Sequence, residues 1–183
     1  MRARLASGNP HKLVELRRAL PGWEIELSAE RDFPPETGST YAENARGKAL
    51  YARAQAAADE WALGEDSGIE VAALGGRPGV DSARWAQDGV ARLLEELGGI
   101  ADRRARYVCV IVAIGPSGGE LVCDGTLEGA IAVTPRGDGG FGYDPIFVPA
   151  GEIFTVAELG DDWKTVNSHR ARAAAALAAA VAP

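Results

Sequence analysis

Lysine is scarce in this chain, and positive charge is outweighed by negative charge. Of the 19 basic residues among 183, only Lys12, Lys48 and Lys164 are lysines, and the formal net charge is −7. A surface that binds nucleic acid neutralises phosphates with clustered basic residues, so this balance argues against a nucleic-acid partner. Because the chain otherwise uses arginine, the three lysines are candidates for positions that need a compact point charge.

Cysteine motifs and long apolar runs are also missing. Cys109 and Cys123 are the two cysteines; their spacing matches no zinc or redox motif and both lie in apolar stretches, so we expect buried, reduced thiols. No window approaches the length of a membrane span, and residues 1–6 hold no apolar segment of signal-peptide length. These absences predict a cytoplasmic protein without a membrane partner. The length and the 46% hydrophobic content favour a single domain over residues 1–183, with room for two lobes.

Hydrophobic periodicity predicts where strands and helices lie. Residues 107–114 are apolar on both faces and rich in β-branched side chains, which predicts a central strand covered on both sides. The other expected strands are 2–6, 23–27, 61–63, 69–74 and 120–126, and the expected helices are 11–20, 41–60, 89–97 and 169–181, with a helical turn at 155–159 that ends at residues 160–163.

The most informative stretch is Leu-Gly-Glu-Asp-Ser-Gly at residues 63–68. We expect a buried strand to end there and to deliver its acids to a cleft. Successive side chains on a strand point to opposite faces, so Glu65 and Asp66 can face one ligand only if the strand has ended or bulged. Asp66 is the primary candidate, because Ser67 and Gly68 let the backbone turn beside a ligand. The alternative is an ordinary exposed turn.

A second candidate site follows the first strand. Residues 7–12 form a glycine-containing turn between a strand and a helix start, a geometry that aims backbone N–H groups and the helix dipole at an anion. Lys12 falls in the first helical turn, where a cation disfavours the helix, and a ligand phosphate explains it better. Ser7 and Asn9 either add hydrogen bonds to that ligand or cap the helix.

The later part of the chain contains a candidate pocket for a base. Four glycines surround Phe141, Tyr143 and Asp144, so the two rings lie on an irregular loop. One ring could stack on a purine while Asp144 accepts from a ring N–H, or both rings could tuck back into the core. Residues 169–170, His-Arg, open the last predicted helix with cations, which favours a ligand contact over the solvated alternative.

Taken together, these segments resemble the inosine triphosphate pyrophosphatase family, also called XTP/dITP diphosphatases. The matching motifs run in the family's order: Ser7-Gly8-Asn9 with Lys12 and Glu15, Glu36-Thr37-Gly38 with Glu43-Asn44-Ala45, Glu65-Asp66-Ser67-Gly68, Gly75-Gly76 with Pro78-Gly79, Phe141-Gly142-Tyr143-Asp144-Pro145, and Ser168-His169-Arg170. Each motif is short, but the ordered set from residue 7 to residue 170 is specific.

The resemblance implies an α/β fold, with an elongated mixed β-sheet flanked by helices and two lobes around a central cleft, in a homodimer. It implies Mg²⁺-dependent hydrolysis of ITP, dITP and XTP to the nucleoside monophosphate and pyrophosphate, which cleanses the nucleotide pool. Asp66 looks like the general base and a metal ligand, with Glu36 and Glu65 as the other candidate ligands. Glu65 stands where Asp is frequent, so the choice between them stays open.

The remaining roles carried over by the resemblance concern the nucleotide. The triphosphate would be held by Ser7, Gly8, Asn9, Pro10, His11, Lys12, Ser67 and Lys164. The base would be held by Phe141, Gly142, Tyr143, Asp144, His169 and Arg170. Lys48 and Arg84 are further candidates. Two other functions remain open at this stage: a related Maf-type pyrophosphatase for pyrimidine or modified nucleotides, and a nucleotide sensor without turnover.

Overall fold

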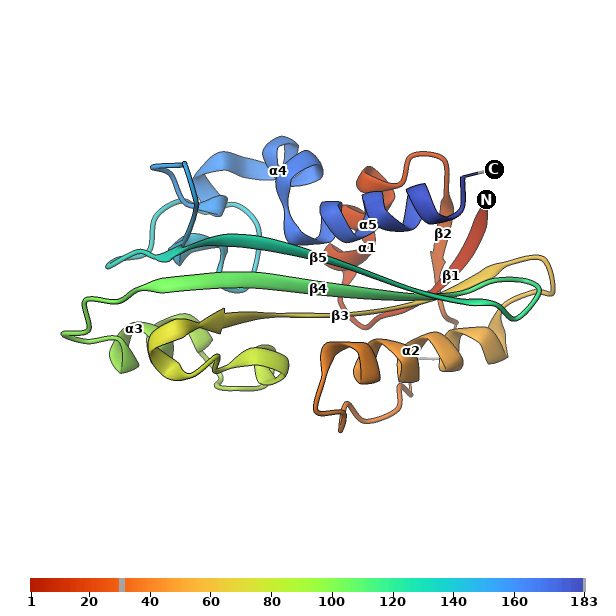
Figure 1. Ribbon diagram of the computed structural model, residues 1–183, viewed down its shortest axis with the longest axis horizontal. Helices are drawn as coiled ribbons and strands as arrows, with labels where there is room; N and C mark the ends of the chain where they lie inside the picture. Colours follow the sequence, from red (N-terminus) through yellow and green to blue (C-terminus); the bar gives the residue numbers. More distant parts are fainter. Residues whose placement is uncertain (30–31, 183) are drawn as a thin grey trace. The chain divides into compact units, whose positions relative to one another are not determined.

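The computed structural model describes residues 1–29 and 32–182, and it contains one mixed sheet flanked by helices (Figure 1). The strands are β1 (Arg2–Ala6), β2 (Glu24–Leu27), β3 (Trp61–Val71), β4 (Arg104–Ile114), β5 (Glu120–Ile131) and β6 (Phe147–Pro149). The helices are α1 (Pro10–Ala19), α2 (Tyr41–Gln55), α3 (Gly89–Glu96), α4 (Val156–Asn167) and α5 (His169–Ala180). The strand order is β2-β1-β3-β4-β5-β6; β1 is parallel to β2 and β3, and β5 is antiparallel to β6. The predicted fold class is confirmed.

The chain divides into two compact units, each built from segments that are distant in the sequence. Unit 1 comprises Met1–Asp66, Cys109–Gly125 and His169–Pro183, and unit 2 comprises Ser67–Val108 and Thr126–Ser168. Strands β3, β4 and β5 each contribute residues to both units. In the described part of the chain, no helix combines the length and the apolar character that a membrane crossing requires.

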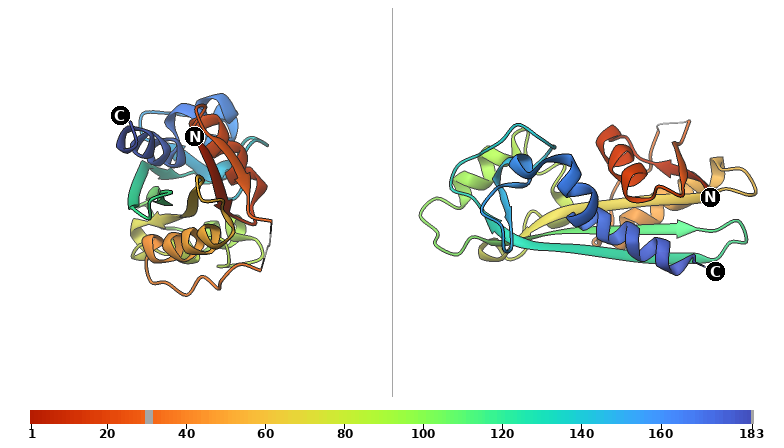
Figure 2. Two further views of the ribbon diagram at one scale, coloured as in Figure 1. Left: turned by 90° about the vertical axis from the view of Figure 1, so that its right-hand side faces the viewer. Right: turned by 90° about the horizontal axis from the view of Figure 1, so that it is seen from above.

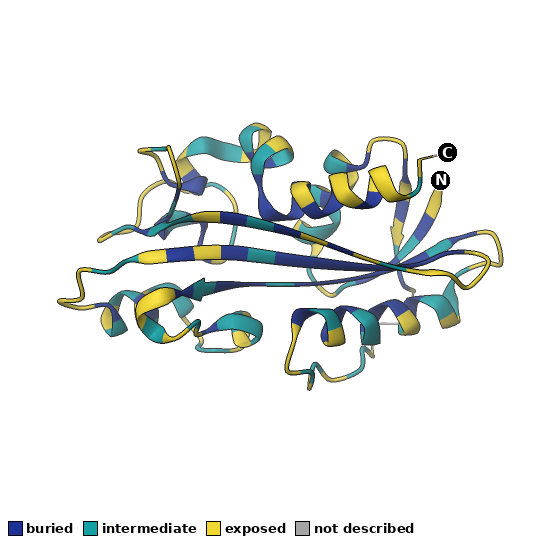
Figure 3. Ribbon diagram, in the orientation of Figure 1, coloured by how far each residue is buried: buried dark blue, intermediate teal, exposed yellow. Residues whose placement is uncertain are grey.

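In unit 1, helices cover both faces of the sheet. Helix α2 lies against one face, and α1 and α5 lie against the other (Figure 2). The core on the α1 and α5 face includes Leu5, Leu16, Leu63, Ile111 and Leu177, all with at most 1% exposure. Burying each such side chain contributes about 1.5–3 kcal/mol. Figure 3 shows that the sheet-facing sides of α2 and α5 are buried while their outer sides are exposed.

Two strand glycines let helices approach the sheet closely. A Cβ built on Gly64 would lie 2.0 Å from the backbone oxygen of Ala45 and 2.4 Å from the backbone nitrogen of Ala49, both in α2. A Cβ on Gly125 would lie 2.2 Å from the backbone oxygen of His169 in α5. No side chain fits at either position without moving the helix, so these glycines set the depth at which α2 and α5 pack.

Unit 2 has its own core, to which α3 and α4 contribute. It includes Ile69 and Val71 from β3, Leu93 from α3, Phe147 from β6 and Val156 from α4. Each of these side chains is at most 2% exposed. The glycine-rich segment that precedes β6 is anchored on this core, so its position depends on unit 2.

The prediction that a strand ends after residue 63 and a turn follows at residues 67–68 is wrong. β3 continues without interruption from Trp61 to Val71, and the strand expected over 69–74 is its last part, followed by a 3₁₀ turn at Ala72–Leu74. Ser67 and Gly68, on which the predicted turn rests, lie inside this strand. The acids therefore lie within a strand.

The other elements follow the prediction with shifted ends. The central strand is confirmed as β4, and α3 and α5 match their expected ranges closely. Thr40 caps α2 through a hydrogen bond from the backbone N–H of Glu43. Helix α2 stops at Gln55, because Ala56 adopts extended backbone angles. The predicted end at residue 160 is wrong: Gly160, with φ of 79°, kinks α4, but the helix resumes and runs to Asn167. Both cysteines are buried free thiols, as predicted.

Candidate active site

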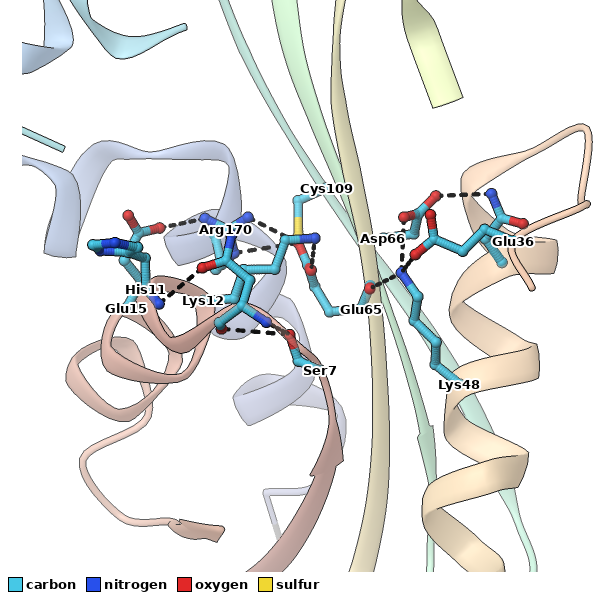
Figure 4. A network of polar contacts seen from close by, with 12 residues as sticks. Ser7, His11, Lys12, Glu15, Glu36, Lys48, Glu65, Asp66, Cys109 and Arg170 are labelled. Atoms are coloured by element: carbon cyan, nitrogen blue, oxygen red, sulfur yellow. Dashed lines mark hydrogen bonds and ion pairs between the residues drawn. The ribbon is translucent and has the colours of Figure 1, made fainter. Parts of the chain in front are cut away.

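The pleat of β3 separates the two adjacent acids. Residues 64 and 66 share one face of the strand, and Gly64 touches α2, so the Asp66 side chain points toward α2 as well. Glu65 points to the opposite face, toward α1 and α5, as Figure 4 shows. Asp66 is 3% exposed and Glu65 is 1% exposed. The strand therefore presents one carboxylate to each side of the sheet in unit 1.

On the α2 face, Asp66 lies in a small polar cluster. Its Oδ1 accepts from Lys48 Nζ at 3.0 Å, and its Oδ2 accepts from Asn44 Nδ2 at 3.1 Å. Lys48 also forms an ion pair with Glu36. The Asn44 side chain in turn accepts from the backbone N–H of Gly38 at 2.8 Å, which ties the loop that carries Glu36 to the first turns of α2. Residues 36, 44, 48 and 66 thus come together, and they include Asp66 and Glu36, the two acids for which the resemblance implies a shared metal.

Burial and neighbouring charges shift the pKa values of Asp66 and Lys48. Desolvation raises the pKa of Asp66 above its usual value, and the opposing effects of Lys48 and Asn44 do not cancel it. Burial would lower the pKa of Lys48, but Asp66, Glu65 and Glu36 outweigh it and raise that pKa. A carboxyl group with a raised pKa is a better proton acceptor than an ordinary aspartate.

A hollow of about 250 Å³ opens beside this cluster. It lies between the loop before α2 and the first turns of that helix. Its lining residues are Pro34, Pro35, Glu36, Thr37, Gly38, Glu43, Asn44 and Gly47. Glu36 and Asn44 belong both to this hollow and to the Asp66 cluster, so the carboxylates lie near space that small ligands can enter.

On the opposite face, Glu65 joins a closed network of ion pairs. Its Oε2 lies 2.7 Å from Lys12 Nζ, and its Oε1 accepts from Arg170 Nη2 at 2.9 Å and from Arg170 Nε at 3.2 Å. Arg170 also pairs with Glu15 from α1. The Cys109 thiol donates to Glu65 Oε1 at 3.3 Å. These contacts connect β3 with the first turns of α1 and α5.

The acidic and basic side chains of this network stabilise one another's charged forms. Burial alone would raise the pKa of Glu65, but Arg170, Lys12 and Lys48 hold it well below its usual range. Burial disfavours the charge of Arg170, yet Glu65 and Glu15 raise its pKa further above an already high value. The Arg170 side chain is 1% exposed, so its guanidinium is part of the interior of unit 1.

The turn before α1 has the predicted strand, turn and helix geometry. Asn9 caps the helix, because its Oδ1 accepts from the backbone N–H of His11 at 2.9 Å, and Pro10 opens the first turn. Ser7 Oγ accepts from the backbone N–H of Asn9 at 3.2 Å. Gly8, Pro10 and His11 are exposed. Asn9 thus acts as the cap that the sequence left as one alternative, and Lys12 points to Glu65.

In unit 2, the predicted base-binding loop is held by a buried acid. Asp144 Oδ2 accepts from Lys164 Nζ at 2.7 Å and from the backbone N–H of Phe141 at 2.9 Å, and its Oδ1 accepts from the Tyr107 hydroxyl at 3.2 Å. Lys164 Nζ also lies 4.7 Å from the centroid of the Phe141 ring, within range of a cation–π contact. The structure brings Phe141, Asp144 and Lys164 together.

The two rings of this loop differ. Tyr143 belongs to the unit 2 core, its hydroxyl donates to the Ser82 backbone oxygen at 3.0 Å, and burial raises its pKa to about 12. It follows the alternative in which a ring tucks into the core. Phe141 is partly exposed and Gly142 is exposed. Phe141 is therefore the ring of this pair that is more accessible for stacking on a ligand.

The remaining candidates are more scattered. His169 is buried at the start of α5 in unit 1, and Ser67 is partly exposed in β3 directly after Asp66. Arg84 is exposed and pairs with Asp81 at 2.9 Å, an ordinary surface ion pair. Sequence reasoning missed the roles of Glu15 and Tyr107, the partners of Arg170 and Asp144. Glu15 was marked only by its place in the first motif, and nothing in the sequence marked Tyr107.

Comparisons with known proteins find relatives of this chain in both sequence and fold. A model of the Ham1 family matches residues 3–180. A dITP/XTP pyrophosphatase of Symbiobacterium thermophilum is 49% identical over 93% of this chain and 90% of its own length. One from Gloeobacter violaceus is 48% identical over 92% of this chain and 88% of its own. The solved structure of the Staphylococcus aureus Ham1 protein aligns with a TM-score of 0.85 and 38% identity, covering 99% of this chain and 98% of its own.

These matches extend over nearly the whole chain in both sequence and fold. The family resemblance that the ordered motifs indicated is confirmed, and the chain belongs to the Ham1 family.

Proposed function

We propose that this protein hydrolyses noncanonical purine nucleoside triphosphates, such as dITP, XTP and ITP, to the nucleoside monophosphate and pyrophosphate. Family membership supports this proposal, since the relatives compared above are named dITP/XTP pyrophosphatases. The observation that carries it is the position of Asp66. Its buried carboxylate lies with Glu36, Asn44 and Lys48 beside an open hollow, on the face of β3 opposite the closed Glu65 network.

Asp66 is the proposed general base. Hydrolysis requires a water molecule to lose a proton as it attacks a phosphorus atom, and a carboxylate within hydrogen-bond reach can accept that proton. Burial raises the pKa of Asp66, which makes it a stronger base than a solvated aspartate. Asn44 and Lys48 each hold one of its oxygens and fix its orientation.

Asp66 and Glu36 are the proposed ligands of Mg²⁺. Their carboxylate oxygens are suited to a cation, because both acids already pair with the Lys48 ammonium. Among residues 1–29 and 32–182, no cluster of three or more acidic, His or Cys side chains is arranged to hold a metal. That suits Mg²⁺, which often takes one or two carboxylates and completes its shell with waters and substrate phosphates. When bound, Mg²⁺ would neutralise phosphate charge and acidify a coordinated water.

Glu65 is the weaker of the candidate metal ligands. It lies on the other face of the strand, and Lys12 and Arg170 occupy both of its oxygens. A position in the Asp66 cluster would require that network to open. We therefore propose Glu36 as the second carboxylate.

We also propose which residues of each unit contact the phosphates and the base of the nucleotide. In unit 1, the capped turn at residues 7–12 and Lys12 are proposed to hold the triphosphate, which requires the Lys12 ammonium to leave Glu65. Ser67 and Lys164 remain candidates for the same role, although Lys164 pairs with Asp144 in unit 2. For the base, Phe141 is favoured because its ring is partly exposed. His169 and Arg170 stay predicted base contacts, and direct contact by Arg170 requires its buried guanidinium to become uncovered.

A nucleotide panel tests the proposed function. Turnover of ITP, dITP and XTP should be compared with that of ATP, GTP, dTTP and UTP in the presence of Mg²⁺, with pyrophosphate and orthophosphate measured separately. We expect pyrophosphate release from the three noncanonical purines to exceed that from the other nucleotides. Release of orthophosphate, a preference for pyrimidine nucleotides, or binding without turnover would each overturn the proposal.

The homodimer and the cytoplasmic location are further parts of the proposal. The family resemblance supports the dimer, and the proposed action on the cell's nucleotide pool supports the location. Sedimentation of the purified protein at several concentrations would measure the oligomeric state.

A further inference from the structure

The Lys48 ammonium is surrounded by oxygen atoms. It pairs with Glu36 Oε1, donates to Asp66 Oδ1 at 3.0 Å and donates to the backbone oxygen of Glu65 at 3.0 Å (Figure 4). An ammonium group has three N–H donors, so these contacts use its full capacity. The residue is 8% exposed, which is unusual for a lysine. A protein cation therefore occupies a cage of carboxylate and carbonyl oxygens.

The same cage provides the ligand type that a hard divalent cation prefers. Both oxygens of Asp66 are engaged, one by Lys48 and the other by Asn44. A metal ion that binds Asp66 and Glu36 must therefore share or replace the contacts of Lys48. Because two cations beside the same carboxylates repel each other, the bound ammonium opposes the arrival of the metal.

We propose that Lys48 is a resident counter-cation that keeps divalent-metal affinity low until the nucleotide arrives. In the nucleotide-free protein, Lys48 neutralises Asp66 and Glu36 and competes with the metal. A triphosphate offers the displaced ammonium a new anionic partner, so metal and nucleotide bind cooperatively. This inference rests on the proposed function, because it takes Asp66 and Glu36 as the metal ligands.

A simple structural role for Lys48 predicts a different result. If Lys48 only anchored α2 to β3, its removal would destabilise the fold and weaken metal binding. If Lys48 competes with the metal, its removal leaves two acids without their cation, and metal binding becomes tighter. The direction of the change therefore separates the two roles without any measurement of turnover.

The experiment is a Mn²⁺ titration of the nucleotide-free protein, followed by electron paramagnetic resonance of the free ion. Lys48→Gln should bind Mn²⁺ on the order of tenfold more tightly than the wild type, within the usual range of coupling between two sites. Arg46→Gln is the matched control. It removes the same charge from α2, but the Arg46 guanidinium pairs with Glu120 of β5. We expect its Mn²⁺ affinity to stay within about twofold of the wild type.

Two further variants locate the effect and guard against misfolding. Lys48→Arg keeps the charge and should keep the weak affinity, and Lys48→Gln combined with Asp66→Asn should lose the tight binding. Thermal unfolding of each variant shows whether the fold is intact, and Lys48→Met replaces Lys48→Gln if the latter unfolds. Unchanged or weaker Mn²⁺ binding in the folded neutral variant overturns the proposal, as does tight binding that survives Asp66→Asn. Failure of the proposed function would appear separately, as an absence of turnover in the nucleotide panel.

Discussion

Glu65 and Asp66 are neighbours in β3, yet their surroundings differ in charge balance. On the Glu65 face, Glu65 and Glu15 are matched by Lys12 and Arg170, so the network has two acids and two bases. On the Asp66 face, Asp66 and Glu36 both pair with Lys48. The pKa of Glu65 is held well below its usual range, whereas that of Asp66 is raised.

On the proposed assignment, the difference separates a structural acid from a reactive one. The Glu65 network connects β3 with α1 and α5 through ion pairs that hold both oxygens of the carboxylate. The Asp66 cluster brings two carboxylates to one lysine, and the hollow beside it leaves room for a ligand. Both carboxylates are buried, so charge balance and access distinguish them better than burial does.

Asp66→Asn should give the largest functional effect. Asparagine keeps the shape of the side chain but cannot accept a proton from water, so pyrophosphate release from dITP should fall by about 10²–10⁴-fold. The melting temperature should change little, because Lys48 keeps its partner Glu36. Steady-state kinetics and thermal unfolding measure the two quantities. Turnover close to that of the wild type would show that Asp66 is not the base.

Glu65→Gln should mainly affect stability. It removes the carboxylate that faces Arg170 and Lys12, and breaking a buried ion pair by removing one partner costs about 3–5 kcal/mol of unfolding free energy. Urea denaturation measures this loss, and Glu65→Asp, which keeps the charge, should lose less. If Glu65→Gln were stable and as inactive as Asp66→Asn, the assignment of roles to the two faces would be reversed.

Much of the fold could be predicted from periodicity. The apolar run of β4 and the amphipathic pattern of α1 identified their elements correctly. The errors arose where tertiary contacts decide the local structure. Ser67 and Gly68 are typical turn residues, but they lie inside β3, which is paired within the sheet. Such pairing cannot be inferred from neighbouring residues.

The site was predicted in part. The alternation of side chains along a strand indicated that Glu65 and Asp66 diverge if the strand continues, and the resemblance paired Glu36 with Asp66. The burial of Tyr143 and the ion pair between Asp144 and Lys164 were not predictable. Both depend on how the glycine-rich loop packs within unit 2. Motif matching identifies the residues of a site, but their hydrogen-bond partners come from the packing.

Gly64→Ala tests whether the Asp66 cluster depends on the close approach of α2 to β3. The added methyl group would lie 2.0 Å from the Ala45 backbone oxygen, so α2 must shift, and overpacking of this kind typically costs about 1–3 kcal/mol. Because α2 carries Asn44 and Lys48, turnover should fall together with stability. Gly47→Ala is the matched control: its methyl group meets nothing within 4 Å, and alanine favours a helix by about 1 kcal/mol over glycine. A Gly64→Ala protein with normal stability would contradict the close packing.

Asn44→Leu should give the smallest of these effects. It keeps the approximate size of the side chain but removes the hydrogen bond to Asp66 and the bond that ties Gly38 to α2. A hydrogen bond to a charged group is worth about 1.5–3 kcal/mol, so we expect kcat/KM for dITP to fall by roughly tenfold or somewhat more. Arg46→Leu, an exposed change on the same helix, should leave kcat/KM unchanged. If Asn44→Leu is fully active, Lys48 alone orients Asp66, and the Asp66 face depends on its counter-cation even more than the charge comparison implies.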